Sequence, residues 1–268
     1  MIRRAAVAGY FYPRDPEALR GQLAQLLVPG RERRKAVAVV TPHAGYDFSG
    51  AVAGAVFSSV EIPSAFIMLG ISHRPIRSLF AVMSEGVWET PLGDVQVDKS
   101  LAEALLSRSE LIRADPGAHE TEHSLEVQLP FLQAQRPALT IVPLAVSGLA
   151  RYEDLDALGR AVAGAVSESG RDILVIASTD MSHYVPADEA RFKDFLAIQA
   201  ILELDPRRLY DVVRAEGISM CGYQPTTAAL IAARELGATK ADLVMYATSG
   251  DRTGDTSEVV GYAGLRIA

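Results

Sequence analysis

Short, continuously apolar runs recur along the chain, and a longer stretch with apolar residues every three to four positions follows most of them. The short runs are typical of buried strands and the longer stretches of helices. The apolar runs cover residues 36–42, 65–70, 139–146, 172–178 and 241–248. The helical pattern covers residues 49–60, 99–108, 121–135, 151–169, 187–204 and 225–236. This alternation predicts a largely parallel sheet with helices on both faces.

Two further segments, residues 79–97 and 257–267, have the composition of additional strands, antiparallel or at an edge of the sheet. No stretch rich in proline, glycine and serine divides the chain. The sequence therefore predicts one domain over residues 1–268, a three-layer α/β/α domain with a largely parallel or mixed central sheet.

Composition and charge narrow the function classes. The chain has 268 residues, of which 49% are hydrophobic and 22% are charged, and its net charge is −7. This acidic balance argues against a nucleic-acid or anionic-lipid partner, and no apolar run is long enough for a membrane span. A single cysteine allows no internal disulfide, and the first residues do not fit a signal peptide, so we expect a cytoplasmic protein. The one basic cluster is interpreted as a solvated turn and comprises Arg31, Arg33, Arg34 and Lys35.

Three of the five histidines come directly after strand candidates. They are His43, His73 and His183. Because ligands of open α/β sheets bind outside the carboxyl ends of the strands, we expect these three imidazoles in one cleft. Asp180 shares a short loop with His183, so its carboxylate could orient that ring or bind a metal itself.

The segment from His119 to His123 spells H-E-x-x-H, the signature of zinc proteases. That signature requires both histidines on one face of a regular helix. Turn residues 115–117 stand just before His119, and the apolar periodicity begins only at Leu125. No third ligand follows at the expected spacing. We therefore reject the protease interpretation and predict that His119 and His123 do not bind one metal together.

The same segment still offers an acid and a base for other chemistry. His123 and Glu126 are three residues apart, with Glu122 as their neighbour. Because a charged imidazole gains nothing from a helix N-terminus, we expect His123 to be neutral and to face the cleft, either as an acid/base or behind the ligands.

Cys221 lies in a loop just before a helix that begins near Pro225. Two interpretations remain open from the residues alone. Most free cysteines are small buried hydrophobes, but a thiolate is favoured near a helix N-terminus.

Seven motifs together resemble the Memo family, whose bacterial and archaeal members are called AmmeMemoRadiSam system protein B. The resemblance extends from Ala6 to Gly264 with the motifs in family order, and it implies a fold like that of the class III extradiol dioxygenases. The motifs are VAGYFYP, TPHAGYDFSG, LGISH, EHSLEVQLPFL, STDMSHY, MCGY and YATSGDRTGDTSEVVGYAG.

The resemblance implies a metal held by His43, His73 and Cys221. It places His183 and Asp180 in the same pocket, with His123 nearby as an acid/base. Extradiol enzymes bind Fe(II) through two histidines and a carboxylate, whereas a thiolate also suits Cu(I) or zinc. Fe(II) or Cu(I) is therefore expected, with zinc possible. Glu126 and Glu122 could stand behind the ligands, and either of them or Asp180 could supply a carboxylate ligand instead.

Three functions follow from the resemblance and the residues. The first is a metal-dependent oxidoreductase acting on a small substrate, with His123 or His183 moving protons. The second is a pocket protein without turnover that binds a peptide or partner protein. The third is a metal-dependent hydrolase in which Asp180 and His183 activate water. The family name also implies a pathway link to an AMMECR1-like protein and a radical SAM protein.

Overall fold

One sheet of twelve strands organises the chain in a computed structural model that describes residues 1–268. The strands are β1 (Ile2–Arg3), β2 (Ala38–Thr41), β3 (Ala65–Ile71), β4 (Phe80–Val82), β5 (Val87–Thr90), β6 (Gly93–Val97), β7 (Ile112–Ala114), β8 (Thr140–Val146), β9 (Ile173–Ser178), β10 (His183–Val185), β11 (Ala241–Thr248) and β12 (Val259–Ile267).

Nine α-helices and two 3₁₀ turns connect these strands. The helices are α1 (Pro16–Leu26), α2 (Tyr46–Ser59), α3 (Lys99–Leu106), α4 (Leu129–Gln135), α5 (Tyr152–Ser169), α6 (Ala187–Leu202), α7 (Pro206–Ala215), α8 (Tyr223–Glu235) and α9 (Gly250–Thr253), and the turns are η1 (Pro116–His119) and η2 (Glu126–Gln128). None of the helices is long and apolar enough to cross a membrane.

The centre of the sheet is parallel and its flanks are mixed, as the sequence predicts. The main path has the order β1-β5-β6-β8-β3-β9-β2-β12-β10. Strands β6, β8, β3, β9 and β2 run parallel to one another. Strand β12 joins β2 in the antiparallel sense and also pairs with β10 and β11. The segment 257–267 therefore lies inside the sheet and not at its edge.

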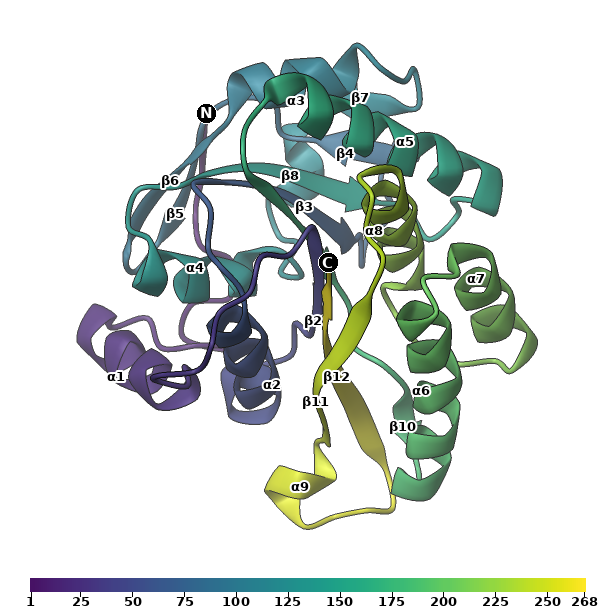
Figure 1. Cartoon of the computed structure of the whole chain (residues 1–268). Coiled ribbons are helices and arrows are strands. Elements are labelled where there is room, and N and C mark those ends of the chain that lie inside the picture. Colours follow the sequence, from purple (N-terminus) through teal and green to yellow (C-terminus); the bar gives the residue numbers. More distant parts are fainter.

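Helices cover both faces of the sheet, which confirms the three-layer fold class. In Figure 1, α3, α5 and α8 lie on one side of β3 and β8, and α1, α2 and α4 lie on the other. Neighbouring residues of the central strands alternate between two separate cores. Val40 and Leu69 belong to a core of 43 residues, whereas Val39 and Met68 belong to a core of 26. Both faces are apolar, so the strands read as continuous hydrophobic runs.

The helix expected over residues 121–135 is shorter than its pattern suggests. Residues 121–125 are not helical, a 3₁₀ turn follows at η2, and α4 begins only at Leu129. Helices α1 and α7 were not expected. Each begins with the pair Asp-Pro, in which the aspartate side chain caps the helix and the proline takes its first position.

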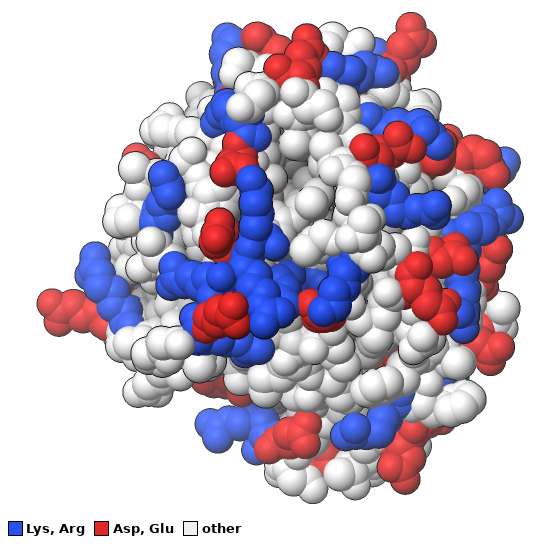
Figure 2. All heavy atoms as spheres, viewed as in Figure 1, with Lys and Arg blue, Asp and Glu red and all other residues white.

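Charged residues of both signs are intermixed on the surface. Figure 2 shows one gathering of basic side chains near the place where Figure 1 marks the C-terminus. Three carboxylates pair with cations of the basic cluster 31–35, of β12 or of the residue before β11. The pairs are Lys35 with Asp172, Arg34 with Glu32, and both Lys240 and Arg266 with Asp242. The segment 31–35 is exposed, as expected of a solvated turn.

Candidate metal centre

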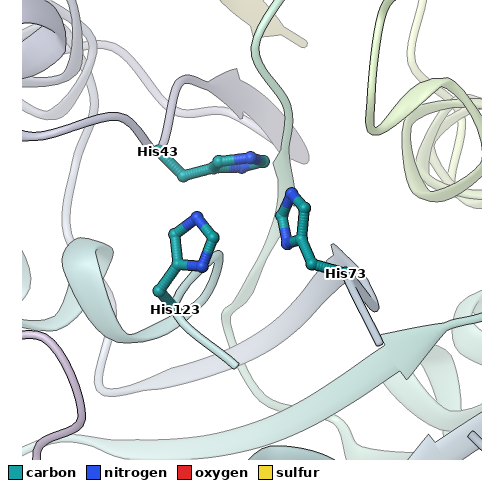
Figure 3. A group of neighbouring side chains, drawn as sticks. All are labelled: His43, His73 and His123. Atoms are coloured by element: carbon teal, nitrogen blue, oxygen red, sulfur yellow. The ribbon is translucent and has the colours of Figure 1, made fainter. Parts of the chain in front are cut away.

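Three imidazoles from distant parts of the chain converge at the carboxyl edge of the sheet. They belong to His43, His73 and His123, and one ring nitrogen of each lies within 4.8 Å of the others. Figure 3 shows the three rings facing one another, with His43 and His73 on the segments that follow β2 and β3. The ring centroids are 5.2 Å apart for His43 and His73 and 4.5 Å apart for His73 and His123.

The positions of two ligand candidates follow from strand order. Strands β3, β9 and β2 are neighbours and parallel, and each is followed at its second position by a polar residue. These residues are His73 after β3, Asp180 after β9 and His43 after β2. Because the strands end at the same edge, the three side chains meet in the crevice where α/β proteins bind ligands.

Ser178 fixes the tautomer of His43. The Ser178 hydroxyl donates its only proton to the carbonyl of Ser124 at 2.6 Å. Nδ1 of His43, 3.0 Å from the same hydroxyl, must therefore carry a hydrogen and donate it. Burial, and after it the charge of His73, lower the pKa of His43 to about 3. His43 is thus neutral, with the lone pair of Nε2 free.

Glu122 orients the ring of His73 by accepting a hydrogen bond from its Nδ1 atom. Its carboxylate accepts hydrogen bonds from the backbone amide of His73 at 2.8 Å and from Nδ1 at 3.0 Å. It also accepts from the backbone amides of His123 and Ser124. Burial opposes ionisation of Glu122, but these hydrogen bonds and the charge of His73 outweigh it and lower its pKa. An ionised carboxylate only accepts, so Nδ1 of His73 donates and Nε2 is left free.

His123 reaches the site from a loop between η1 and η2. Its ring stacks on His73 and packs edge-on against Phe11 at a centroid distance of 4.8 Å. Burial, followed by the charge of His43, lowers the pKa of His123 to about 4. The ring is therefore neutral at pH 7 and faces the cleft.

Asp180 and Cys221 border the imidazole group. The backbone amide of His43 donates to Asp180 at 2.8 Å, and burial raises the pKa of that carboxyl group. Sγ of Cys221 lies 3.3 Å from Nε2 of His43 and accepts from the backbone amide of Asp180 at 3.2 Å. Burial, and after it the charge of Asp180, raise the pKa of Cys221 to about 12. The free thiol therefore keeps its proton, for which the Asp180 carbonyl at 3.6 Å is an acceptor.

His183 does not belong to the group of converging imidazoles. After Asp180 the chain turns into β10, and the His183 ring bonds to the carbonyl of Ser219 at 2.9 Å. His183 lies near enough for its charge to lower the pKa of His43. The place we expected it to take beside His43 and His73 is taken by His123, which arrives from a loop and not from a strand end.

Glu126 faces away from the imidazoles. Its side chain is fully buried and forms an ion pair with Arg3. It also accepts from the backbone amides of Ala6 and Val7 and from the Tyr12 hydroxyl at 2.5 Å. With its oxygens occupied by these donors, Glu126 has no acceptor directed at the cleft.

His119 is separate from the cluster as well. Its ring is fully buried, packs against Trp88 and donates from Nε2 to the Ala81 carbonyl. The pair His119 and His123 thus forms no zinc-protease site.

The donor set fits a transition metal ion. Two nitrogens bound to one ion are at most about 4.2 Å apart, twice a metal–nitrogen bond of about 2.1 Å. The 4.8 Å group requires only a small approach of the rings. Imidazoles are ligands for zinc, copper, iron or nickel, and Asp180 and Cys221 stand beside them as further donors. The residues present therefore fit a metal.

The fold and this site define an α/β protein with a candidate metal centre at the carboxyl edge of its sheet. A profile described as Memo-like protein matches residues 3–266. The chain therefore belongs to the Memo family.

Curated relatives agree over their full length. A MEMO1 family protein of Methanothermobacter thermautotrophicus is 44% identical over 99% of this chain and 100% of its own. One from Aquifex aeolicus is 42% identical, with 98% of each chain covered. The crystal structure of an uncharacterized Escherichia coli K12 protein has a TM-score of 0.58 at 14% identity, covering 87% of this chain and 100% of that one. This last likeness shows a shared fold.

Sequence reasoning named Glu122, which orients His73, but not the residues that orient His43. Ser178, Ser124 and Gln128 form a buried hydrogen-bond network beneath His43. The one available signal for Ser178 was its place at the carboxyl end of a strand. Phe11 was visible only as a letter of the VAGYFYP motif.

Proposed function

We propose that this Memo family protein is a metal-dependent oxidoreductase that acts on a small substrate and holds its ion with His43, His73 and His123. One observation carries the proposal. Ser178 and Glu122 each accept a hydrogen bond from an Nδ1 atom, so that Nε2 is the ring nitrogen of His43 and of His73 that remains for an ion, and the His123 imidazole lies in the same group. Such an arrangement is typical of metal ligands and their supporting shell.

The chain supplies more than ligands. Bound there, an iron ion would supply redox chemistry, and imidazoles beside a carboxylate are the donors that non-haem Fe(II) prefers. Asp180, with its raised pKa, can hold a proton next to His43. Phe11 forms an apolar wall against His123 and excludes water from that side of the cleft. His183, on the same edge, is placed to exchange protons with solvent.

A metal-dependent hydrolase is the second candidate. Three imidazoles are also the ligand set of zinc enzymes that ionise a bound water. The three nitrogen donors of the group favour this alternative, and Asp180 would then act as the base.

The first experiment is a metal titration. Metal-free protein is titrated anaerobically with Fe(II) and separately with zinc, and compared with His43→Ala, His73→Ala and His123→Ala. We expect one ion per chain in the wild type and at least about a hundred-fold weaker binding in each variant, because each loses a ligand. His119→Gln is the matched control, since that imidazole is buried outside the cleft.

Oxygen uptake by the iron-loaded protein then separates the two reactions. Uptake that depends on Fe(II) and on His123 supports the oxidoreductase. Wild-type binding in all three alanine variants contradicts the metal site itself, and a loaded protein that consumes no oxygen with any phenolic substrate but hydrolyses an ester favours the hydrolase.

A further inference from the structure

Glu126 binds the first residues of the chain to the loop that carries His123. All four of its donors come from residues 1–14, which we call the amino-terminal segment. They are the Arg3 guanidinium, the backbone amides of Ala6 and Val7, and the Tyr12 hydroxyl. Glu126 itself lies three residues beyond His123. The amino-terminal segment is therefore hydrogen-bonded to the loop that carries Glu122 and His123.

Arg3 also donates hydrogen bonds to backbone carbonyls of this loop. Besides its ion pair with Glu126, it donates to the carbonyl of His119 at 3.0 Å and to the carbonyl of Glu122 at 2.6 Å. Its guanidinium also lies 4.3 Å from the centre of the Trp88 ring. Arg3 therefore binds the loop 119–126 at three points, on both sides of the residues that face the imidazoles.

The far end of the amino-terminal segment touches the site itself. Phe11 packs on the ring of His123, and its carbonyl accepts from the backbone amide of Tyr46 at 2.8 Å. The Tyr46 hydroxyl in turn donates to the carbonyl of Val127 at 2.6 Å. The His123 ring therefore packs against Phe11 as well as against His43 and His73.

Stability does not explain this arrangement. The side chains of Arg3 and Glu126 are 2% and 0% exposed, so both charges are removed from water. Replacing a buried ion pair by apolar residues is often neutral or stabilising, because desolvation offsets the attraction. A fully hydrogen-bonded buried pair does, however, select one arrangement of the segments it joins.

We propose that Arg3 and Glu126 are positioning residues of the metal centre and that Phe11 is the contact through which the amino-terminal segment holds His123. The inference rests on the proposed metal binding. Without the segment, the loop 119–126 loses the donors that fix its carbonyls, and the His123 imidazole loses one of the three rings against which it packs. Order in the amino-terminal segment and affinity for the ion are then coupled, and each strengthens the other.

Zinc affinity is the first measurement, made by competition with a coloured chelator. Phe11→Ala removes the contact with His123 and leaves the ion pair. The double variant Arg3→Met with Glu126→Gln removes both charges, so that neither is left buried and unpaired. The control double variant, Arg266→Met with Asp242→Asn, removes a partly buried ion pair between β11 and β12. Thermal melts of the metal-free proteins report folding separately.

Cleavage by trypsin after the exposed Arg4 is the second measurement, followed by mass spectrometry with and without zinc. We expect zinc binding to weaken about ten-fold or more in Phe11→Ala and in the Arg3/Glu126 double variant, and to stay unchanged in the control. We also expect zinc to slow the cleavage in the wild type and not in His123→Ala.

The possible results separate a failure of the proposed metal site from a failure of the proposed coupling. If the wild type binds no zinc, the proposed metal site fails before this inference is reached. If the wild type binds and Phe11→Ala binds within two-fold of it, while zinc leaves cleavage after Arg4 unchanged, the coupling is overturned. Should the double variant fail to fold, Phe11→Ala decides alone, because its half-buried side chain lies outside both cores' fully buried residues.

Discussion

At the scale of single residues, the candidate metal centre depends on hydrogen bonds that decide which nitrogen of each imidazole is free. One serine proton, donated to the Ser124 carbonyl, settles the tautomer of His43. One ionised carboxylate, Glu122, settles that of His73. Neither group needs to touch the ion. Each accepts a hydrogen bond from Nδ1. Nε2 is then the ring nitrogen that remains for an ion.

Cys221 gives the sharpest test at this scale. Its thiol is protonated in the metal-free protein because burial and Asp180 raise its pKa to about 12. If the sulfur binds the ion, that proton must leave. We expect zinc binding at pH 7.5 to release about one proton more from the wild type than from Cys221→Ser. Proton release is measured with an indicator dye in weak buffer. Equal release from both proteins assigns Cys221 to packing and leaves the imidazoles as the ligands.

His43, His73 and Asp180 could be placed from the sequence because each follows an apolar run that had to be a buried parallel strand. Local pattern and one general rule on strand ends were enough. His123 could be predicted to face the cleft but not to join His43 and His73, since its position depends on contacts with Glu122, Phe11 and Ser124, which belong to no strand and which no strand pattern in the sequence places. His183 lies outside the group of three imidazoles because the chain turns into β10 after Asp180.

At the scale of elements, buried strands were easier to predict than amphipathic helices. The central strands are apolar on both faces, so each appears in the sequence as a short continuous apolar run. Helix α1 buries only Leu19 and Leu23, and helix α7 is only ten residues long although its buried residues have helical spacing. The sequence nevertheless marks the start of each helix with an Asp-Pro pair, Asp15-Pro16 and Asp205-Pro206. The same pair at Asp115 starts only a 3₁₀ turn, so the signal fixes a beginning and not a length.

The contact between α5 and α8 makes a prediction at this scale. A Cβ atom at Gly159 would lie 2.6 Å from Cβ of Ile231 and 2.7 Å from the carbonyl of Ala228, and neither can move freely. A Cβ at Gly164, in the same helix, would meet only the end of the Arg108 side chain. We expect Gly159→Ala to destabilise the protein by about 1–3 kcal/mol. Gly164→Ala should be neutral or should stabilise by up to about 1 kcal/mol. Urea unfolding measures both, and equal effects would contradict the close packing.

At the scale of the whole molecule, the fold separates stability from chemistry. The two apolar cores lie on the faces of the sheet, whereas the imidazoles gather at its carboxyl edge, outside both. Neutral histidines are nevertheless buried there, and a third, His119, is buried beside Trp88. Burying an imidazole that must stay uncharged links the stability of the entire chain to pH.

Burial lowers the pKa of His43 to about 3 and those of His119 and His123 to about 4, against about 6.5 in an unfolded chain. Below pH 6.5 the unfolded state therefore binds more protons than the folded state, and the free energy of unfolding falls as pH falls. The raised pKa of Asp180 acts in the opposite direction, but only as the pH approaches the range where a carboxyl group takes up its proton.

We expect each buried histidine to remove on the order of 1–2 kcal/mol of stability between pH 6.5 and 5. Urea unfolding from pH 8 to 5, in the presence of a chelator, measures the loss. Above pH 6.5 stability should change little on account of these groups. His119→Gln should show a smaller loss than the wild type, because one titrating group is gone while an amide can still donate to the Ala81 carbonyl. A wild-type protein equally stable at pH 8 and pH 5 would show that its imidazoles are free to take up protons in the folded state, and their neutrality, on which the metal site depends, would fall with that result.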